Sequence, residues 1–105
     1  ICSRRAVDGD TLTGAGGADE VLLYNERGEL TEFTIGNLVV ERDGHLLTPP
    51  IESGLLPGSY RRYLLERGVI EEQGLKVDDL SLCSRLWLIN AVRKWCRVEL
   101  EAGTA

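Results

Sequence analysis

One dipeptide, Asp43-Gly44, limits the possible folds of this chain more than any other feature. It separates two apolar segments, residues 38–42 and 45–48, and Asp-Gly is a preferred two-residue hairpin turn because both positions adopt positive φ. Two consecutive prolines end the second segment, since proline cannot donate a hydrogen bond to a sheet. We therefore expect an antiparallel β-hairpin near the middle of the chain.

Short strands and helices in mixed order surround this hairpin. Apolar runs predict strands over residues 20–25, 69–72, 86–90 and 95–100. A helix is predicted over residues 59–68, with Ser59 as its N-cap and Gly68 at its end, and a shorter helix is predicted over residues 78–82. Because strands and helices do not alternate strictly, the sequence predicts an α+β fold with a mixed β-sheet and two or three short helices.

The first 18 residues differ in composition from the rest of the chain. Asp8-Gly9-Asp10 and the glycine-rich residues 14–17 are typical of turns and linkers. We expect residues 1–18 to form a loosely ordered lead-in, with a short helical turn around residues 4–7. The 105 residues fit one small domain, which we place at residues 19–105.

The charge of the chain argues against two classes of partner. Twelve Lys and Arg stand against seventeen Asp and Glu, a net charge of -5, whereas nucleic acids and anionic membranes attract a concentrated positive field. The longest apolar runs are too short to span a bilayer. Three widely spaced cysteines and a single histidine form no metal-binding pattern. We therefore expect a cytoplasmic protein with no metal site and no nucleic-acid or membrane partner.

Three segments place polar or small residues at the ends of predicted strands or helices. Glu32 lies in residues 30–38, which lead into a buried strand, and a buried carboxylate needs a partner. Gly58-Ser59-Tyr60 precedes a helix, whose N-terminal N–H groups favour anions, and Asn90 ends a strand. Each segment also has an ordinary interpretation: a surface ion pair for Glu32, a helix cap without a ligand for Ser59, a turn residue for Asn90. Together they indicate a phosphate-bearing cofactor.

The order of the motifs adds a resemblance to a known family. Residues 19–23, 25–32, 36–38, 47–50, 53–61 and 88–93 follow one another in a pattern that resembles the class IV aminotransferases. This family comprises pyridoxal-phosphate (PLP) enzymes of fold type IV, among them branched-chain and D-amino-acid aminotransferases and 4-amino-4-deoxychorismate lyase. The resemblance covers residues 19–101. Residues 90–95 and 97–98 are most similar to the lyase branch, particularly to the lyase end of fused para-aminobenzoate synthases.

The resemblance implies the mixed-sheet or barrel-like C-terminal domain of a fold type IV enzyme. It implies as the parent reaction the elimination that converts 4-amino-4-deoxychorismate, a small-molecule substrate, into para-aminobenzoate and pyruvate for folate synthesis. Two alternatives stay open: a branched-chain or D-amino-acid aminotransferase, or a non-catalytic domain that keeps the fold and serves assembly or interaction. The implied protein partner is a second copy in a homodimer, or an N-terminal domain that these residues lack.

PLP is the cofactor that the resemblance implies. In the family a carboxylate bonds its pyridine nitrogen and keeps that nitrogen protonated, and two loops hold its phosphate. The residues that match these cofactor-binding positions are Glu32 at the nitrogen, Thr34 and Asn37 near the ring and the strand start, Gly58, Ser59 and Tyr60 in the first loop, and Asn90, Ala91 and Val92 in the second.

The lysine that joins PLP covalently in the family has no match in this chain. The family places it roughly twenty residues before the motif that begins at Asp19, hence at or before Ile1. Residues 1–3 contain no lysine, and neither Lys76 nor Lys94 matches that position. We therefore assign no catalytic residue, and we expect this chain to be the C-terminal portion of a longer enzyme and inactive by itself.

Overall fold

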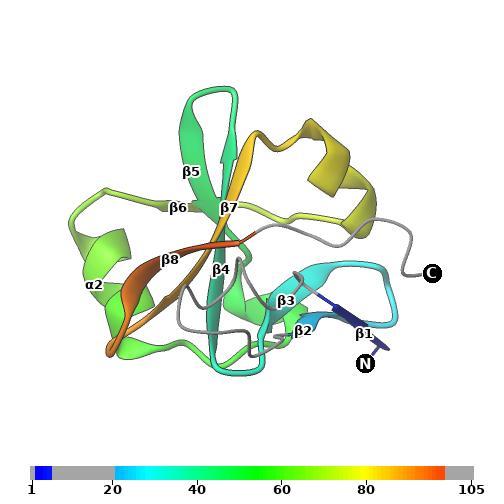
Figure 1. Ribbon diagram of the computed structural model, residues 1–105, viewed down its shortest axis with the longest axis horizontal. Helices are drawn as coiled ribbons and strands as arrows, with labels where there is room; N and C mark the ends of the chain where they lie inside the picture. The colour runs from blue at the N-terminus through cyan, green and yellow to red at the C-terminus, as the bar shows by residue number, and fades with distance from the viewer. Residues whose placement is uncertain (1, 6–20, 99–105) are drawn as a thin grey trace.

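The computed structural model describes residues 2–5 and 21–98, which form one eight-stranded sheet with short helices beside it (Figure 1). The strands are β1 (Cys2–Arg5), β2 (Val21–Tyr24), β3 (Leu30–Phe33), β4 (Gly36–Arg42), β5 (His45–Thr48), β6 (Glu71–Glu72), β7 (Arg85–Asn90) and β8 (Lys94–Val98). The helices in these residues are the α-helix α2 (Ser59–Glu66) and the 3-10 helices η1 (Ile51–Ser53) and η2 (Val77–Leu82).

Strand β4 is the centre of the sheet, because it pairs with three other strands. β3 pairs with the start of β4 and β5 with its last residues, 40–42, while β7 pairs with residues 37–41 on the other edge. Every pairing is antiparallel except that between β5 and β6. The predicted α+β fold with a mixed sheet is therefore confirmed.

The hairpin expected at Asp43-Gly44 joins β4 to β5. The φ angles of Asp43 and Gly44 are 53° and 80°, the left-handed conformations that a two-residue hairpin turn requires. Arg42 and His45 pair across the turn. The local sequence therefore predicted both the turn and its conformation.

A second hairpin divides residues that the sequence pattern assigns to the approach to one strand. Residues 30–38 contain β3, a turn at residues 34–35 and the start of β4, with Phe33 opposite Gly36. A Cβ atom at Gly36 would lie 2.6 Å from the backbone oxygen of Ile89. Glycine therefore lets β7 approach the start of β4 closely.

The N-terminal residues that the structure describes form a strand, not a helical turn. β1 pairs antiparallel with β2, with Arg4 opposite Leu22 and Arg5 opposite Val21, so the expected helical turn is wrong at Arg4 and Arg5. Pairing with a neighbouring strand satisfies these backbone groups in place of a helical turn. Residue 1, residues 6–20 and residues 99–105 lie outside the described residues, and with them most of the expected lead-in and its boundary at residue 19.

Helix α2 begins with Gly58 as its N-cap, so the prediction of Ser59 as the cap is wrong. Gly58 has the extended conformation of an N-cap (φ −67°, ψ 157°), Ser59 is the first helical residue, and no side chain bonds to the cap. The helix ends at Glu66, and Gly68 follows with a φ of 73°, in agreement with the predicted stop. The first turn of α2 is therefore left without a side-chain acceptor.

Two clusters of buried apolar side chains hold the sheet and α2 together. Successive β4 residues join different clusters, because successive side chains of a strand point to opposite faces: Leu38 joins the first and Val39 the second. Leu64 attaches α2 to the second cluster, which also contains Val39, Ile70 and Ile89. The first cluster contains Leu22, Leu30, Phe33, Leu38, Val40, Leu75, Leu86, Leu88 and Val98.

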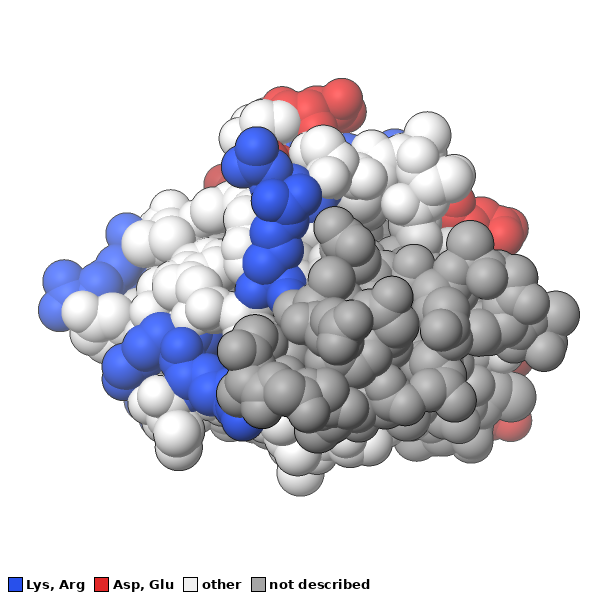
Figure 2. All heavy atoms as spheres, viewed as in Figure 1, with Lys and Arg blue, Asp and Glu red and all other residues white. Residues whose placement is uncertain are grey.

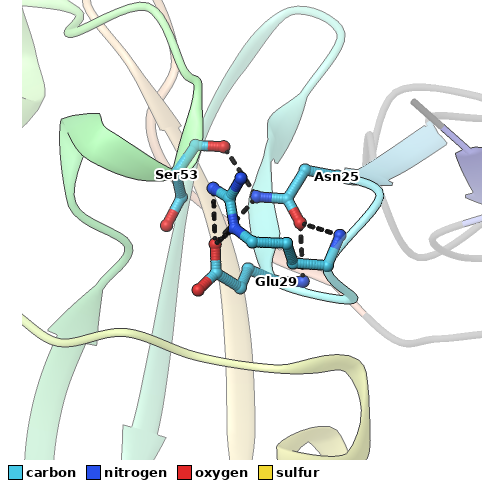
Figure 3. A network of polar contacts seen from close by, with 4 residues as sticks. Asn25, Glu29 and Ser53 are labelled. Atoms are coloured by element: carbon cyan, nitrogen blue, oxygen red, sulfur yellow. Dashed lines mark hydrogen bonds and ion pairs between the residues drawn. The ribbon is translucent and has the colours of Figure 1, made fainter.

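A buried amide, Asn25, connects the β2–β3 turn to η1 (Figure 3). Its Nδ2 donates to the backbone oxygen of Ser53 and to Oε1 of Glu29, both at 2.9 Å. Its Oδ1 accepts from the backbone N–H groups of Arg27, at 2.8 Å, and Glu29, at 3.0 Å. Both ends of the amide are thus satisfied, and the turn and η1 are held as one unit.

We expect Glu29→Gln to make the stability of the fold less sensitive to acid. Hydrogen bonds from Asn25, and then from Arg27, lower the pKa of Glu29 from its ordinary value of 4.5. A lowered pKa contributes stability that is present above the pKa of the unfolded chain and is lost as the pH falls through the folded pKa. In urea unfolding at a series of pH values, the variant should lose less stability below pH 4.5 than the original chain does.

Glu26→Gln is the matched control for this measurement, because it removes one negative charge from the same turn but none of the hydrogen bonds around Asn25. The two variants should differ in their acid profiles. Identical profiles for Glu29→Gln and the original chain would contradict the contribution of this network.

Candidate functional site

A cavity of about 540 Å³ opens where three connecting segments meet. These segments are the β3–β4 turn, the loop that precedes α2 and the β7–β8 turn, which come together although they are far apart in the sequence (Figure 1). The residues that line the cavity are Leu23, Glu32, Phe33, Thr34, Ile35, Gly36, Asn37, Leu56, Gly58, Ser59, Tyr60, Asn90 and Ala91.

Eight of the nine residues assigned to cofactor binding line this cavity. They are Glu32, Thr34, Asn37, Gly58, Ser59, Tyr60, Asn90 and Ala91. Val92 is the exception, because it does not line the cavity and its side chain is 88% exposed. What Val92 contributes instead is a backbone N–H group, which donates to Oδ1 of Asn90 at 3.0 Å.

Glu32 brings a negative charge to the cavity and keeps one carboxylate oxygen available. Its Oε1 accepts a hydrogen bond from the backbone N–H of Leu56 at 3.1 Å. Its Oε2 makes no hydrogen bond or ion pair with any residue that the structure describes. Oε2 can therefore accept a proton donor from a molecule in the cavity.

Asn37 is 4% exposed and holds the loop that precedes α2. Its Nδ2 donates to the backbone oxygen of Leu56 at 2.9 Å, and its Oδ1 accepts from the backbone N–H of Gly58 at 3.2 Å. A Cβ atom at Gly58 would lie 2.7 Å from this oxygen, so only glycine fits there without displacement. Both amide groups of Asn37 are engaged by the loop, which makes Asn37 a positioning residue for the start of α2.

Asn90 is a positioning residue for the β3–β4 turn and the β7–β8 turn, the other two segments around the cavity. Its Nδ2 donates to the backbone oxygen of Ile35 at 2.9 Å, across the mouth of the β3–β4 turn. Its Oδ1 accepts from the N–H groups of Val92 and Arg93 at 3.0 and 2.7 Å, closing the β7–β8 turn. The turn-forming interpretation of Asn90 is therefore correct for its local contacts, and the bond to Ile35 adds a long-range connection.

The start of α2 provides backbone donors at the cavity. Ser59 and Tyr60 line it, and the first N–H groups of an α-helix have no acceptor within the helix. No side chain caps α2, and its first turn contains no acidic residue. These groups and the helix dipole favour a negatively charged group at this position.

Five lining residues were not among the sequence candidates: Leu23, Phe33, Ile35, Gly36 and Leu56. Most of them are apolar, and apolar side chains in a strand give no signal that distinguishes a cavity wall from a core. Leu56 had a weak signal, because it lies in the segment Gly54–Gly58 that is rich in glycine and proline; in the structure its side chain is 77% exposed. Apolar residues of this kind form most of the wall of a small-molecule site, and the few polar groups orient the ligand.

The part of the chain that the structure describes contains neither a metal cluster nor a membrane-spanning helix. Within residues 2–5 and 21–98, no three His, Cys, Asp or Glu side chains gather as metal ligands would. No helix of these residues combines the length and the apolar character that crossing a membrane requires.

Residues 12–100 match the model of the family described as Amino-transferase class IV. The chain belongs to this family. Its relatives have both lyase and aminotransferase names. Over 83 residues it is 42% identical to a Schizosaccharomyces pombe protein whose name assigns it provisionally to aminodeoxychorismate lyase, a match that covers 76% of this chain and 36% of the relative.

Two solved structures share the fold. One, from Mesorhizobium loti and provisionally named an amino-acid aminotransferase, has a TM-score of 0.71 and 44% identity, over 74% of this chain and 38% of that protein. The other, 4-amino-4-deoxychorismate lyase from Pseudomonas aeruginosa, has a TM-score of 0.69 and 26% identity, over 79% of this chain and 32% of that protein. The chain thus spans between 32% and 38% of the length of these three relatives.

Proposed function

We propose that this chain forms the PLP-binding part of a 4-amino-4-deoxychorismate lyase, which releases para-aminobenzoate and pyruvate in folate synthesis. The observation that carries the proposal is a single cavity lined both by a carboxylate with an available oxygen and by the uncapped start of an α-helix. Two of the three relatives described above have lyase names, which favours the lyase reaction.

The groups around the cavity fit the two polar ends of PLP. Oε2 of Glu32 can accept the pyridine N–H, and the N–H groups of Ser59 and Tyr60 can donate to the phosphate. Gly58 has no side chain that could cover the start of α2. A Cβ atom at this position would clash with the side chain of Asn37. The lining residues therefore match the cofactor in charge and in hydrogen-bonding character.

Each polar residue then has a distinct task. When bound, PLP serves as an electron acceptor for the substrate carbon beside the amino group. The charge of Glu32 holds a proton on the pyridine nitrogen, which strengthens that property. Asn37 keeps the start of α2 in place, and Asn90 keeps the two turns together.

Catalysis requires an amine and a partner that the described residues around the cavity do not supply. Neither lysine of the chain, Lys76 or Lys94, lines the cavity. We therefore infer that the 105 residues by themselves bind PLP without turnover, and that activity needs a longer chain, a second copy in a homodimer, or both. A soluble, cytoplasmic location belongs to the same proposal.

The second candidate function is an amino-acid aminotransferase. The 44% identity to the Mesorhizobium loti protein favours it. The two functions differ in product, so the longer protein, supplied with PLP, would be assayed for para-aminobenzoate from 4-amino-4-deoxychorismate and for transfer of an amino group to a keto acid. Amino transfer without para-aminobenzoate would overturn the lyase assignment.

Titration of the purified chain with PLP, followed by absorbance, tests the cofactor site. We expect saturable binding, and borohydride reduction with peptide mapping should find no stoichiometric adduct at Lys76 or Lys94. Glu32→Gln keeps an acceptor for the Leu56 N–H but loses the charge, and we expect about tenfold weaker PLP binding from the loss of one charged hydrogen bond.

Glu71→Gln is the matched control, since Glu71 is an exposed carboxylate in β6 and does not line the cavity. It should bind PLP as the original chain does. Equal PLP affinity of Glu32→Gln and the original chain would refute the role of Glu32. Absence of saturable binding by the original chain would refute the cofactor site and favour a non-catalytic domain that keeps the fold.

A further inference from the structure

The candidate cavity carries an imbalance of charge. Among the described side chains that line it, Glu32 is the sole charged one, and no described lysine or arginine lines it. A phosphate monoester has close to two negative charges at neutral pH. Backbone N–H groups and a helix dipole offer partial charges, so a full positive charge near the start of α2 would strengthen phosphate binding.

One cation lies directly beside this part of the cavity. Lys94 helps to line a second hollow of about 480 Å³, which shares Ser59, Tyr60 and Ala91 with the candidate cavity. The Nζ of Lys94 donates to the backbone oxygen of Ala91 at 2.9 Å and lies 5.0 Å from the centre of the Tyr60 ring. The ammonium group is therefore held by two residues that belong to the cavity wall.

The β7–β8 turn and α2 both keep Lys94 at this place. Lys94 closes the turn opposite Asn90, with a φ of 62°, a conformation uncommon for a residue other than glycine. The Tyr60 ring below its ammonium is stacked on Tyr63, with ring centres 5.8 Å apart. The ammonium group of Lys94 thus contacts a tyrosine ring of α2 whose position is supported by stacking on a second tyrosine.

The surroundings of Lys94 are positive rather than acidic. Figure 2 shows Lys and Arg side chains over the region of α2, β8 and the β7–β8 turn, whereas the Asp and Glu side chains on this face lie toward its rim. Arg67 lies over the Tyr63 ring at 4.4 Å, on the same side of α2. No ion pair of Lys94 with a carboxylate is present in the described residues, so its charge is not neutralised locally.

We propose that Lys94 is a further cofactor-binding residue, which supplies the positive charge for the phosphate group at the start of α2. This inference rests on the proposed PLP site. An ammonium group has three N–H donors, and one of them is used by Ala91, so donors remain for a phosphate oxygen. The contact with the Tyr60 ring is a weak one for an exposed lysine, and it can be exchanged for a bond to phosphate.

Calorimetric titration with pyridoxine 5′-phosphate tests this inference, because this PLP analogue lacks the aldehyde and cannot react with lysine. We expect Lys94→Met to weaken its binding about fivefold, the effect of one partly screened charge on a dianion. The difference should shrink at about 1 M salt, where charges are screened beyond roughly 3 Å. Lys94→Arg keeps the charge and should restore most of the affinity.

Two controls separate charge from structure. Lys76→Met removes the other lysine of the chain, which precedes η2 and lines neither hollow, and it should bind as the original chain does. Pyridoxine without phosphate should bind Lys94→Met and the original chain equally. If Lys94 only supported the turn, both ligands would weaken together, the loss would persist in salt, and the inference would be refuted.

The remaining outcomes distinguish this inference from the proposed function. Binding of pyridoxine 5′-phosphate to the original chain, with unchanged affinity in Lys94→Met, would refute the role of Lys94 and leave the PLP site in place. Failure of the original chain to bind the phosphorylated ligand at all would refute both. A loss confined to the phosphorylated ligand, sensitive to salt and restored by arginine, is the result that we expect.

Discussion

Asn37→Ala should weaken binding of pyridoxine 5′-phosphate about 30-fold, because two hydrogen bonds of about 1 kcal/mol each hold the start of α2 in its binding position. The variant leaves the Leu56 oxygen and the Gly58 N–H without the amide that connects them to β4. It also removes the oxygen against which Gly58 packs. We expect the loop to shift, so that the backbone N–H groups at the start of α2 no longer point together at the phosphate. Asn37 acts through the loop, because its own amide bonds to the loop and not to the ligand.

Thr48→Val is the matched control for Asn37→Ala. Thr48 is fully buried, and its hydroxyl donates to the backbone oxygen of Leu38 at 2.6 Å, so its loss also removes a buried hydrogen bond from β4. It does not line the cavity. The control should unfold at lower urea concentration yet bind the ligand as the original chain does. Equal ligand affinity in Asn37→Ala and Thr48→Val would show that the hydrogen bonds from Asn37 to the loop do not determine ligand binding.

Gly36→Ala should lower the free energy of unfolding by about 3 kcal/mol, the upper part of the usual range for an overpacked interior. The added methyl group would lie 2.6 Å from the backbone oxygen of Ile89 and 2.7 Å from Cδ2 of Leu88. A backbone oxygen within a strand cannot move without breaking the pairing of β4 and β7, so the clash must spread through the centre of the sheet. Urea unfolding followed by tryptophan fluorescence measures the loss.

Gly74→Ala is the comparison that isolates the clash from the general effect of adding a methyl group. A Cβ atom at Gly74 would have no neighbour within 4 Å. Its stability should therefore stay within about 0.5 kcal/mol of the original chain. Similar unfolding midpoints for Gly36→Ala and Gly74→Ala would mean that β7 can move away from the turn at little cost, contrary to the packing described above.

The sequence predicted the elements that depend on neighbouring residues and missed those that depend on distant ones. The β4–β5 hairpin was predicted because Asp43-Gly44 determines its own φ angles. The division of residues 30–38 into two strands was missed, because the reason for Gly36 lies in β7, near the other end of the chain. The cap of α2 was misplaced by one residue for the same reason, since Gly58 is selected by its contact with Asn37.

The candidate site was predicted as a set of residues, whereas their individual contacts were not. The family resemblance assigned nine residues to cofactor binding, and one cavity gathers eight of them. No local pattern reveals that Asn90 reaches the backbone of Ile35, because that bond connects residues 55 positions apart. The sequence analysis assigned Lys94 no role, because its contact with the Tyr60 ring arises only when the chain brings the start of β8 beside α2.

The three pairings of β4 also affect the thermodynamics of ligand capture. Gly36 and Asn37 lie in the part of β4 that pairs with β3 on one edge and approaches β7 on the other. This wall of the cavity is therefore immobilised when the sheet forms. The conformational entropy of these residues is then lost during folding and not again when a ligand enters. At this wall of the cavity, ligand binding therefore meets little further cost from ordering of the protein.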